Sequence, residues 1–291
     1  MIPSRFDYAA PQALEEALSL LQEGGAGAKV LSGGQSLLPV LKLRLAAPEQ
    51  LIDLGRIPGL RRIDAEKDPI AIGAMTTHAM IEDSAALRAV CPLLPEVASC
   101  IGDRQVRNRG TIGGSLANAD PAADWPAAVL ALDAELGAAG PRGAIKLIPA
   151  RDFFYGVMQT ALEPGWLLVE IRIRRPSAGG AAYQKVRQSA SGFAIAGVAA
   201  ILEYGPDRLC KRAGIGITGV AENAFRAVAA EKALLGAPLD QKTIAAAAQL
   251  ATENVDDPLS DIHASGEYRL HLARVHCARA LRRAAGLDAS P

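Results

Sequence analysis

The chain has 291 residues, half of them hydrophobic, and no net formal charge, because 31 lysines and arginines balance 31 aspartates and glutamates. This length can hold two domains, and the balanced charge argues against a nucleic-acid-binding protein, which usually shows a basic field. No uninterrupted apolar run reaches the ~18 residues that a membrane span needs. Acidic residues near the N-terminus stand where a signal peptide needs an apolar stretch, so we expect a cytoplasmic protein.

The cysteines give no sign of a metal site. Four are present, and their spacing forms no C-x-x-C pair and fits neither zinc nor an iron–sulfur cluster: Cys91, Cys100, Cys210 and Cys277. We expect reduced thiols, some of them buried. Any redox metal that works with this chain is therefore expected on another chain.

The N-terminal residues predict a first lobe over about residues 1–56. Apolar residues on one face and two closing glycines predict a helix over residues 11–23. A strand over 28–31 and a short, irregular helix over 37–45 follow, and residues 51–54 look like a second strand.

A second lobe is predicted over residues 57–176. Its strands are expected at 61–63, 70–74, 144–148 and 167–173, and its helices from Thr76 or Thr77 to about residue 83, at 93–101 and at 127–132. The segment PSAGG (residues 176–180) is the clearest linker signal in the chain, so we place a domain boundary there.

Residues 177–291 read as strands followed by helices, an order that predicts an α+β layer domain. The strands are expected at 182–187, 195–204 and 209–218, and the helices at 224–235, 241–253 and 267–285.

Two glycine-rich segments carry the clearest ligand signal. SGGQS (residues 32–36) follows a predicted strand, and Gly110, Gly113 and Gly114 lie together in RGTIGGSLANADPAADW (residues 109–125). Glycine permits positive φ and lets a ligand lie on the backbone, and successive N–H groups in such a turn form an anion-binding concavity. Either segment alone is more simply an ordinary tight turn. Together they indicate two walls around one phosphate-bearing ligand.

These segments also carry a family resemblance. SGGQSLLP (residues 32–39) and TIGGSLANADPAAD (residues 111–124) resemble the FAD-binding medium subunit of the molybdenum hydroxylases, the group that includes carbon-monoxide and xanthine dehydrogenases. IGAMTTHAMIEDS (residues 72–84), IGDRQVRNRG (residues 101–110) and SGEYRLHLA (residues 265–273) resemble the same family in the same order.

The resemblance implies an α+β protein with a two-lobed FAD-binding domain of the vanillyl-alcohol-oxidase (PCMH) type over residues 1–176. A smaller α+β C-terminal domain of antiparallel strands and helices follows over residues 177–291. The resemblance also implies a bound FAD, which we expect to be noncovalent. This FAD would take electrons from the 2Fe–2S clusters of a small subunit and pass them to an external acceptor. Molybdopterin belongs to a large subunit, and the expected assembly is (αβγ)2. The alternative is a stand-alone FAD-dependent oxidase or reductase with the same FAD domain.

The resemblance further implies cofactor-binding residues in both glycine-rich segments, in the loop before residue 78 and at the start of the C-terminal domain. They are Lys29, Leu31, Ser32, Gly33, Gly34, Gln35, Ser36, Leu37, Ala74, His78, Ile101, Gly110, Thr111, Ile112, Gly113, Gly114, Ser115, Asn118, Asp120, Asp124, Leu168, Lys185 and Phe193. No catalytic protein base, nucleophile or metal ligand is expected.

Several of these residues have open alternatives. Asp120 and Asp124 suit ribose or ribityl hydroxyls, with Asp124 the better candidate. His78 is either a ligand or a helix-start residue that contacts backbone. Phe193 replaces a tyrosine of some relatives, which removes a hydroxyl, and a core position is the other interpretation. Arg104 and Arg107 suit structural or partner contacts better than a pyrophosphate.

Two further patterns have simpler explanations. Gly214 to Gly219 match the G-x-G-x-x-G dinucleotide fingerprint, but the alternating isoleucines predict a strand packed against a helix rather than a strand-to-helix turn. The histidines at positions 263, 271 and 276 are eight and five residues apart, which does not place them on one helical face, so no metal site is expected.

Overall fold

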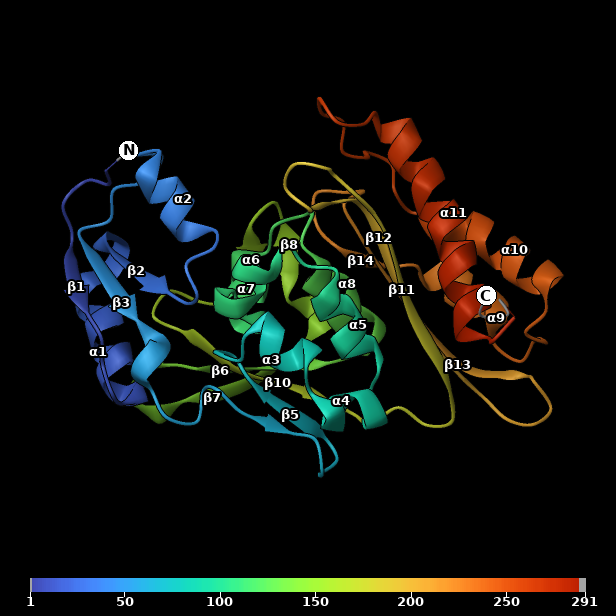
Figure 1. Ribbon diagram of the computed structural model, residues 1–291, viewed down its shortest axis with the longest axis horizontal. Helices are drawn as coiled ribbons and strands as arrows, with labels where there is room; N and C mark the ends of the chain where they lie inside the picture. The colour runs from blue at the N-terminus through green and yellow to red at the C-terminus, as the bar shows by residue number, and fades with distance from the viewer. Residues whose placement is uncertain (1, 288–291) are drawn as a thin grey trace.

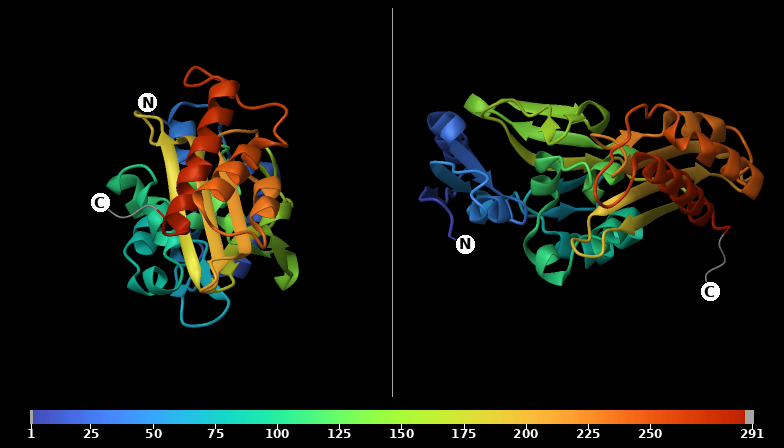
Figure 2. Two further views of the ribbon diagram at one scale, coloured as in Figure 1. Left: turned by 90° about the vertical axis from the view of Figure 1, so that its right-hand side faces the viewer. Right: turned by 90° about the horizontal axis from the view of Figure 1, so that it is seen from above.

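The computed structural model describes residues 2–287 and shows three sheet-containing parts in a row, in chain order (Figure 1). The N-terminal lobe lies at one end, and the C-terminal sheet with its helices lies at the other (Figure 2). The predicted domains include residue 1 and residues 288–291, which lie outside the described residues.

The first lobe is a parallel sheet in the order β1-β3-β2. Its elements are β1 (Asp7–Ala9), α1 (Leu14–Gly24), β2 (Ala28–Leu31), α2 (Leu37–Lys42) and β3 (Gln50–Asp53). Helix α1 packs its apolar face on the sheet, where Ala17 and Leu18 join Ile52 in the core. The helix begins at Leu14 rather than at residue 11, because the backbone of Ala13, at the N-cap position, is extended.

The second lobe has an antiparallel sheet in the order β4-β5-β10-β6-β7. Its strands are β4 (Ile63–Asp64), β5 (Ile70–Gly73), β6 (Glu135–Ala139), β7 (Ile145–Pro149) and β10 (Leu167–Ile173), with the separate pair β8 (Phe154–Gly156) and β9 (Gln159–Thr160). Strand β6 and that pair were missing from the sequence prediction.

Short helices cover the second lobe, and serine, threonine or aspartate begins several of them as an N-cap. They are α3 (His78–Glu82), α4 (Ala85–Val90), α5 (Leu93–Ser99), α6 (Arg104–Arg109), α7 (Ile112–Asn118) and α8 (Asp124–Ala131). Thr77 caps α3 and Thr111 caps α7, each by accepting a backbone N–H of the first turn. All eight residues of α8 are buried, as expected of a helix that is apolar all round.

The C-terminal part is an antiparallel sheet in the order β11-β12-β13-β14, covered by helices on one face. Its elements are β11 (Gly179–Arg187), β12 (Ala194–Tyr204), β13 (Cys210–Thr218), β14 (Phe225–Arg226), α9 (Val228–Leu234), α10 (Gln241–Gln249) and α11 (Gly266–Ala284). The opposite face of the sheet packs against the second lobe, whose core includes Tyr183, Ala199 and Ile201. The predicted α+β class, with antiparallel strands and helices in this part, is confirmed.

The G-x-G-x-x-G segment is the strand β13, as the alternating isoleucines predict. A Cβ on Gly214 would lie 2.0 Å from the carbonyl oxygen of Ala131, and a Cβ on Gly216 would lie 2.0 Å from that of Ala127. Both glycines therefore allow α8 to approach the sheet closely.

Two further element boundaries differ from the prediction. Strand β11 begins at Gly179 rather than at residue 182, so the linker is shorter than the PSAGG segment. The helix predicted at 224–235 begins only at Val228, because Phe225 and Arg226 pair with β13. Within residues 2–287, no helix has both the length and the apolar character needed to cross a membrane.

Candidate functional site

The two glycine-rich segments meet between the first and second lobes. The hydroxyl oxygens of Ser32 and Thr111 lie 2.7 Å apart, and Ser32 also approaches the sulfur of Met75 at 3.0 Å. A Cβ on Gly33 would lie 2.4 Å from the carbonyl oxygen of Arg109, so the two backbones are in direct contact. The connection from β2 to α2 accordingly points toward α6 and α7 (Figure 1).

The first segment has the geometry of an anion-binding loop. Gly33 and Gly34 both have positive φ, 75° and 78°, as the sequence predicts. Among the described residues, the N–H groups of Gly33, Gly34, Gln35 and Ser36 have no hydrogen-bond acceptor. Successive N–H groups without acceptors in a turn of this kind bind an anion such as phosphate.

The second segment differs from its prediction. Gly113 and Gly114 lie in the first turn of α7, and neither they nor Gly110 have positive φ. Their N–H groups are already used, since that of Gly113 donates to Ala74 O at 2.9 Å and that of Gly114 to Thr111 Oγ1 at 3.1 Å. The expectation of free N–H donors here is therefore wrong.

These two glycines instead permit close packing. A Cβ on Gly113 would lie 2.4 Å from the Cβ of Ala74, and one on Gly114 would lie 2.8 Å from the carbonyl oxygen of Ser32. The second segment thus packs against the backbone of the first loop. The half-buried Ser115 and Asn118 follow along the same helix.

A buried ion pair forms beyond the other end of α7. Lys185 Nζ lies 2.8 Å from Asp124 Oδ1 and 2.9 Å from Asp124 Oδ2, and both side chains are 5% exposed. The Tyr183 hydroxyl donates to the same carboxylate, and Lys185 also donates to Cys100 O at 3.1 Å. The hydrogen bond to Cys100 O brings Lys185 and Asp124 close to Ile101, another of the predicted cofactor-binding residues.

The surroundings shift the pKa values of this cluster. Burial raises the pKa of Asp124, and the Lys185 ammonium with its hydrogen bond opposes that rise in part. Burial and the neighbouring carboxylate raise the pKa of Tyr183 well above its usual value, so the phenol remains a hydrogen-bond donor. The carboxylate oxygens are thereby held in one orientation.

Helix α7 sets the spacing of the two clusters. Thr111 caps its N-terminus, and the segment that carries Asp120 and Asp124 follows its C-terminus. Seven residues of α-helix span about 10 Å. The anion-binding loop and the ion pair therefore lie at the two ends of a short helix, which suits an extended ligand with a phosphate group at one end.

His78 is an interior residue. It is 4% exposed, and its Nδ1 accepts a hydrogen bond of 3.0 Å from the indole N–H of Trp125. Burial, with a smaller contribution from the charge of Arg107, lowers the pKa of His78 to about 4. The helix-start alternative describes this position: Thr77 caps α3 and the His78 N–H donates to Gly110 O.

The remaining predicted residues have diverse environments. Leu168 and Ala74 are buried, and Lys29, Gln35 and Ser36 are exposed, while Leu31, Leu37, Ile101 and Asp120 are half-buried. Phe193 is 42% exposed, so its interpretation as a core residue is wrong. Arg107 pairs with Glu82 and donates to Ile101 O, which is a structural role.

The sequence analysis did not identify Tyr183, Trp125 or Thr218. Tyr183 has a recognisable signal, because it lies two residues before Lys185 and shares its face of the strand. Thr218 has none, since its partners are nearly a hundred positions away.

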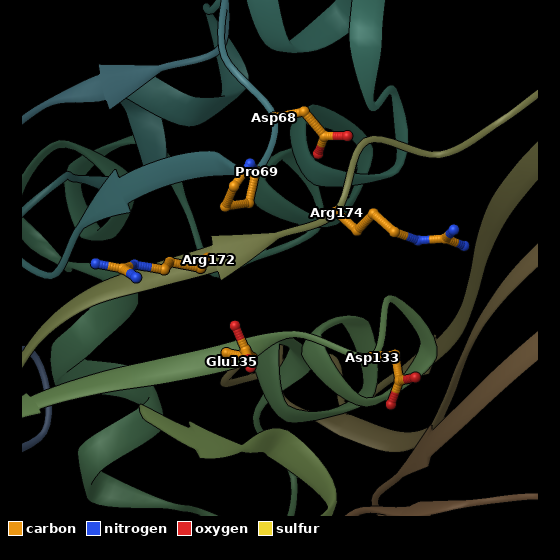
Figure 3. A pocket seen from close by; sticks show the side chains of 6 residues that line it. All are labelled: Asp68, Pro69, Asp133, Glu135, Arg172 and Arg174. Carbon is orange, nitrogen blue, oxygen red and sulfur yellow. The ribbon is translucent and has the colours of Figure 1, made fainter. Parts of the chain in front are cut away.

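A pocket lies elsewhere, beside the second sheet (Figure 3). It is lined by Asp68, Pro69, Asp133, Glu135, Arg172 and Arg174. Arg172 and Arg174 point in opposite directions, and each pairs with a glutamate, Glu170 and Glu203 respectively. The side chains do not converge on one point, and none of them belongs to the predicted set.

Comparison with known families covers almost the whole chain. Residues 4–176 match the family described as the FAD binding domain in molybdopterin dehydrogenase, and residues 181–284 match the CO dehydrogenase flavoprotein C-terminal domain.

Individual relatives agree. The carbon monoxide dehydrogenase medium chain of Afipia carboxidovorans is 41% identical over 98% of each chain. The 6-hydroxypseudooxynicotine dehydrogenase complex subunit alpha of Paenarthrobacter nicotinovorans is 39% identical over 98% of this chain and 96% of that one. A chain of carbon monoxide dehydrogenase from Hydrogenophaga pseudoflava superposes with a TM-score of 0.94 at 42% identity, covering both chains completely. The chain therefore belongs to the FAD-binding flavoproteins of the molybdopterin dehydrogenases, as a relative of the carbon monoxide dehydrogenase medium chain.

Proposed function

We propose that this chain is the FAD-carrying electron-transfer subunit of a molybdenum hydroxylase. It accepts electrons from 2Fe–2S clusters of a small partner subunit and passes them to an external acceptor, while a large subunit holds the molybdopterin. The proposal includes an (αβγ)2 assembly in the cytoplasm. The observation that carries it is the anion-binding loop of residues 33–36, seated on α7 within a chain that matches this family from end to end.

The loop fits the pyrophosphate of FAD. Four neighbouring N–H groups, from Gly33 to Ser36, are without an acceptor among the described residues, and positive φ at the two glycines turns the backbone around them. Thr111 holds the loop in place through Ser32. These backbone N–H groups can bind the phosphate oxygens without any side-chain donor, so the loop by itself supports a phosphate ligand.

The cluster at the other end of α7 is proposed to face the ribityl chain and the ring. Asp124 offers carboxylate oxygens, Lys185 offers a positive charge, and Ser115 and Asn118 lie along the helix between the two ends. Phe193, 42% exposed, supplies an aromatic surface near the start of β12. The rest of the predicted set remains part of this proposal.

Bound FAD supplies the redox chemistry that lets single-electron donors serve a two-electron acceptor. The protein residues bind it, orient it and set the charge around it. No residue of this chain is assigned a proton-transfer or nucleophilic role, so the proposal places substrate oxidation on the large subunit.

A titration with two flavins tests the proposal. The purified chain, stripped of flavin, is titrated with FAD and with FMN, and quenching of flavin fluorescence is followed. Tight binding of FAD with poor binding of FMN supports the proposal, because FMN lacks the pyrophosphate. Equal affinity for both, or no binding of FAD, contradicts it.

Metal analysis separates the subunit from its alternative. The recombinant chain alone is expected to hold neither iron nor molybdenum and to show no hydroxylase activity, whereas native material is expected to contain two further subunits. Turnover of an organic substrate by the FAD-loaded chain alone would favour the stand-alone oxidase or reductase.

A further inference from the structure

The segment between α7 and α8 is held by the C-terminal sheet. Three successive carbonyls of this segment accept hydrogen bonds from residues at the ends of β12 and β13. Gly219 N donates to Pro121 O at 2.8 Å, Ala194 N donates to Ala122 O at 3.1 Å, and Thr218 Oγ1 lies 2.7 Å from Ala123 O. The C-terminal domain thus determines the backbone path that leads to Asp124.

Thr218 is the only side chain among these three donors, and it is completely buried. Its hydroxyl lies within hydrogen-bond distance of two carbonyls, since Pro121 O is 2.8 Å away. A hydroxyl has one proton to donate. Pro121 O also accepts the N–H of Gly219, whereas Ala123 O is the nearer acceptor and receives no other donor among the described residues, so we assign the proton to Ala123 O.

This hydrogen bond acts directly on Asp124. The carbonyl of Ala123 and the N–H of Asp124 belong to one planar peptide unit. Holding the carbonyl oxygen therefore fixes the orientation of the plane from which Asp124 begins α8. The carboxylate at the other end of this residue is held by Tyr183 and Lys185.

Lys185, which holds the carboxylate, and Thr218, which holds the Ala123 carbonyl, lie in one row across the sheet. Lys185 pairs with Gly197, and Gly197 pairs with Thr218, so these three residues lie side by side on β11, β12 and β13. Gly197 leaves the space that the row needs. A Cβ there would lie 2.4 Å from the Tyr183 hydroxyl and 2.9 Å from the Thr218 methyl carbon.

We propose that Thr218 is a positioning residue of the flavin site, which holds Asp124 in its binding orientation through the Ala123 carbonyl. The inference rests on the proposed function, in which Asp124 and Lys185 contact FAD. Without the hydroxyl, a buried carbonyl has no donor, and the segment shifts to find one. The Asp124 carboxylate then shifts from its binding orientation and the affinity for FAD falls, although Thr218 itself does not touch the cofactor.

The test compares variants of the full chain. Thr218→Val replaces the hydroxyl with a methyl group of similar size, and Thr218→Ser keeps the hydroxyl. Thr252→Val is the matched control, because Thr252 is also buried in the C-terminal domain and accepts a hydrogen bond from Arg274 Nε at 2.9 Å. FAD affinity, the visible circular dichroism of bound flavin and the thermal midpoint are measured for each.

Thr218→Val is expected to weaken FAD binding about tenfold or more, the equivalent of one lost hydrogen bond. It is also expected to change the visible circular dichroism of the flavin, and Thr218→Ser is expected to restore both. Thr252→Val is expected to lower the thermal midpoint and leave FAD affinity unchanged. If Thr218 has a purely structural role, Thr218→Val will lower the thermal midpoint and leave FAD affinity unchanged, as is expected for Thr252→Val.

The outcomes separate this inference from the proposed function. Wild-type affinity and an unchanged spectrum in Thr218→Val overturn the positioning role and leave the proposed function intact. Absence of FAD binding by the wild-type chain overturns both. If Thr218→Val does not fold, the pair Thr218→Ser and Thr218→Ala decides, because these two differ only by the hydroxyl; equal FAD affinity of the pair overturns the positioning role.

Discussion

Ser32 and Thr111 are 79 positions apart in the chain, and their hydroxyl oxygens lie 2.7 Å apart. Thr111 also caps α7, since its Oγ1 accepts the N–H of Gly114. One side chain therefore joins the anion-binding loop of the first lobe to the helix that spans the site.

Replacing Thr111 by valine is expected to lower stability and FAD affinity together. Loss of an N-cap costs about 0.5–2 kcal/mol of stability, and loss of the contact with Ser32 frees the loop. Denaturant unfolding and FAD titration measure the two effects. Ser84→Ala removes only the cap of α4 and is expected to lower stability without changing FAD affinity. A Thr111→Val variant with unchanged affinity would show that the loop does not depend on this contact.

Gly33→Ala is expected to weaken FAD binding at least tenfold. The residue has φ of 75°, and the new methyl group would lie 2.4 Å from the carbonyl oxygen of Arg109, so the loop must move. Gly143→Ala is the matched control. Gly143 has the same φ, but nothing lies within 4 Å of its Cβ position. Gly143→Ala therefore has the same backbone strain, about 1–2 kcal/mol, but no clash of its methyl group with a neighbouring atom. FAD titration should show weaker binding for Gly33→Ala than for Gly143→Ala.

Gly216→Ala tests whether β13 is a structural strand or a dinucleotide-binding turn. Its methyl group would lie 2.0 Å from the Ala127 carbonyl oxygen, an overpacking that typically costs about 1–3 kcal/mol or more. We expect a large loss of thermal stability and nearly normal FAD affinity in the molecules that fold. Gly156→Ala, where the nearest atom is 3.7 Å away, is the control. If Gly216→Ala abolishes FAD binding in folded protein while Gly114→Ala does not, the fingerprint interpretation is correct.

The flavin is expected to be noncovalent. Neither residues 32–36 nor residues 110–118 contain a histidine, cysteine or tyrosine that forms a covalent flavin link. Denaturing the yellow protein with acid should release all flavin into the supernatant, where its absorbance is measured. Colour that remains with the precipitated protein would contradict this expectation.

His78 should make stability depend on pH. Its pKa is about 4 in the folded protein and 6.5 as a free side chain, so between these values the unfolded state binds more protons. The free energy of unfolding therefore falls as pH falls through this window, by about 3 kcal/mol in total. His276 has a lowered pKa too, so some slope remains without His78.

The variant His78→Asn isolates this contribution, because its amide oxygen takes the place of Nδ1, which accepts the indole N–H of Trp125. Denaturant unfolding at several pH values between 4 and 7 should give a flatter curve for the variant than for the wild type. Parallel curves would show that burial of His78 does not lower its pKa.

Local sequence patterns determined much of the fold. The glycines of residues 32–36 predict the positive φ found at Gly33 and Gly34, because a short turn after a strand depends on nearby backbone alone. The alternation of Ile215 and Ile217 likewise predicts the strand β13, and the pair Thr76 and Thr77 predicts a cap for α3, which Thr77 provides. The motif resemblance adds the family to which the chain belongs.

Only the tertiary structure decided how the site is built. Gly113 and Gly114 look like loop residues, yet they lie in α7, where glycine is needed because Ala74 and Ser32 leave no room for a side chain beside them. The partners of Asp124 come from a strand about sixty residues later, and Thr218 reaches a carbonyl 95 positions away. Such contacts have no local pattern, because they form only when the two domains pack together and bury hydrogen-bonding groups that must then find partners.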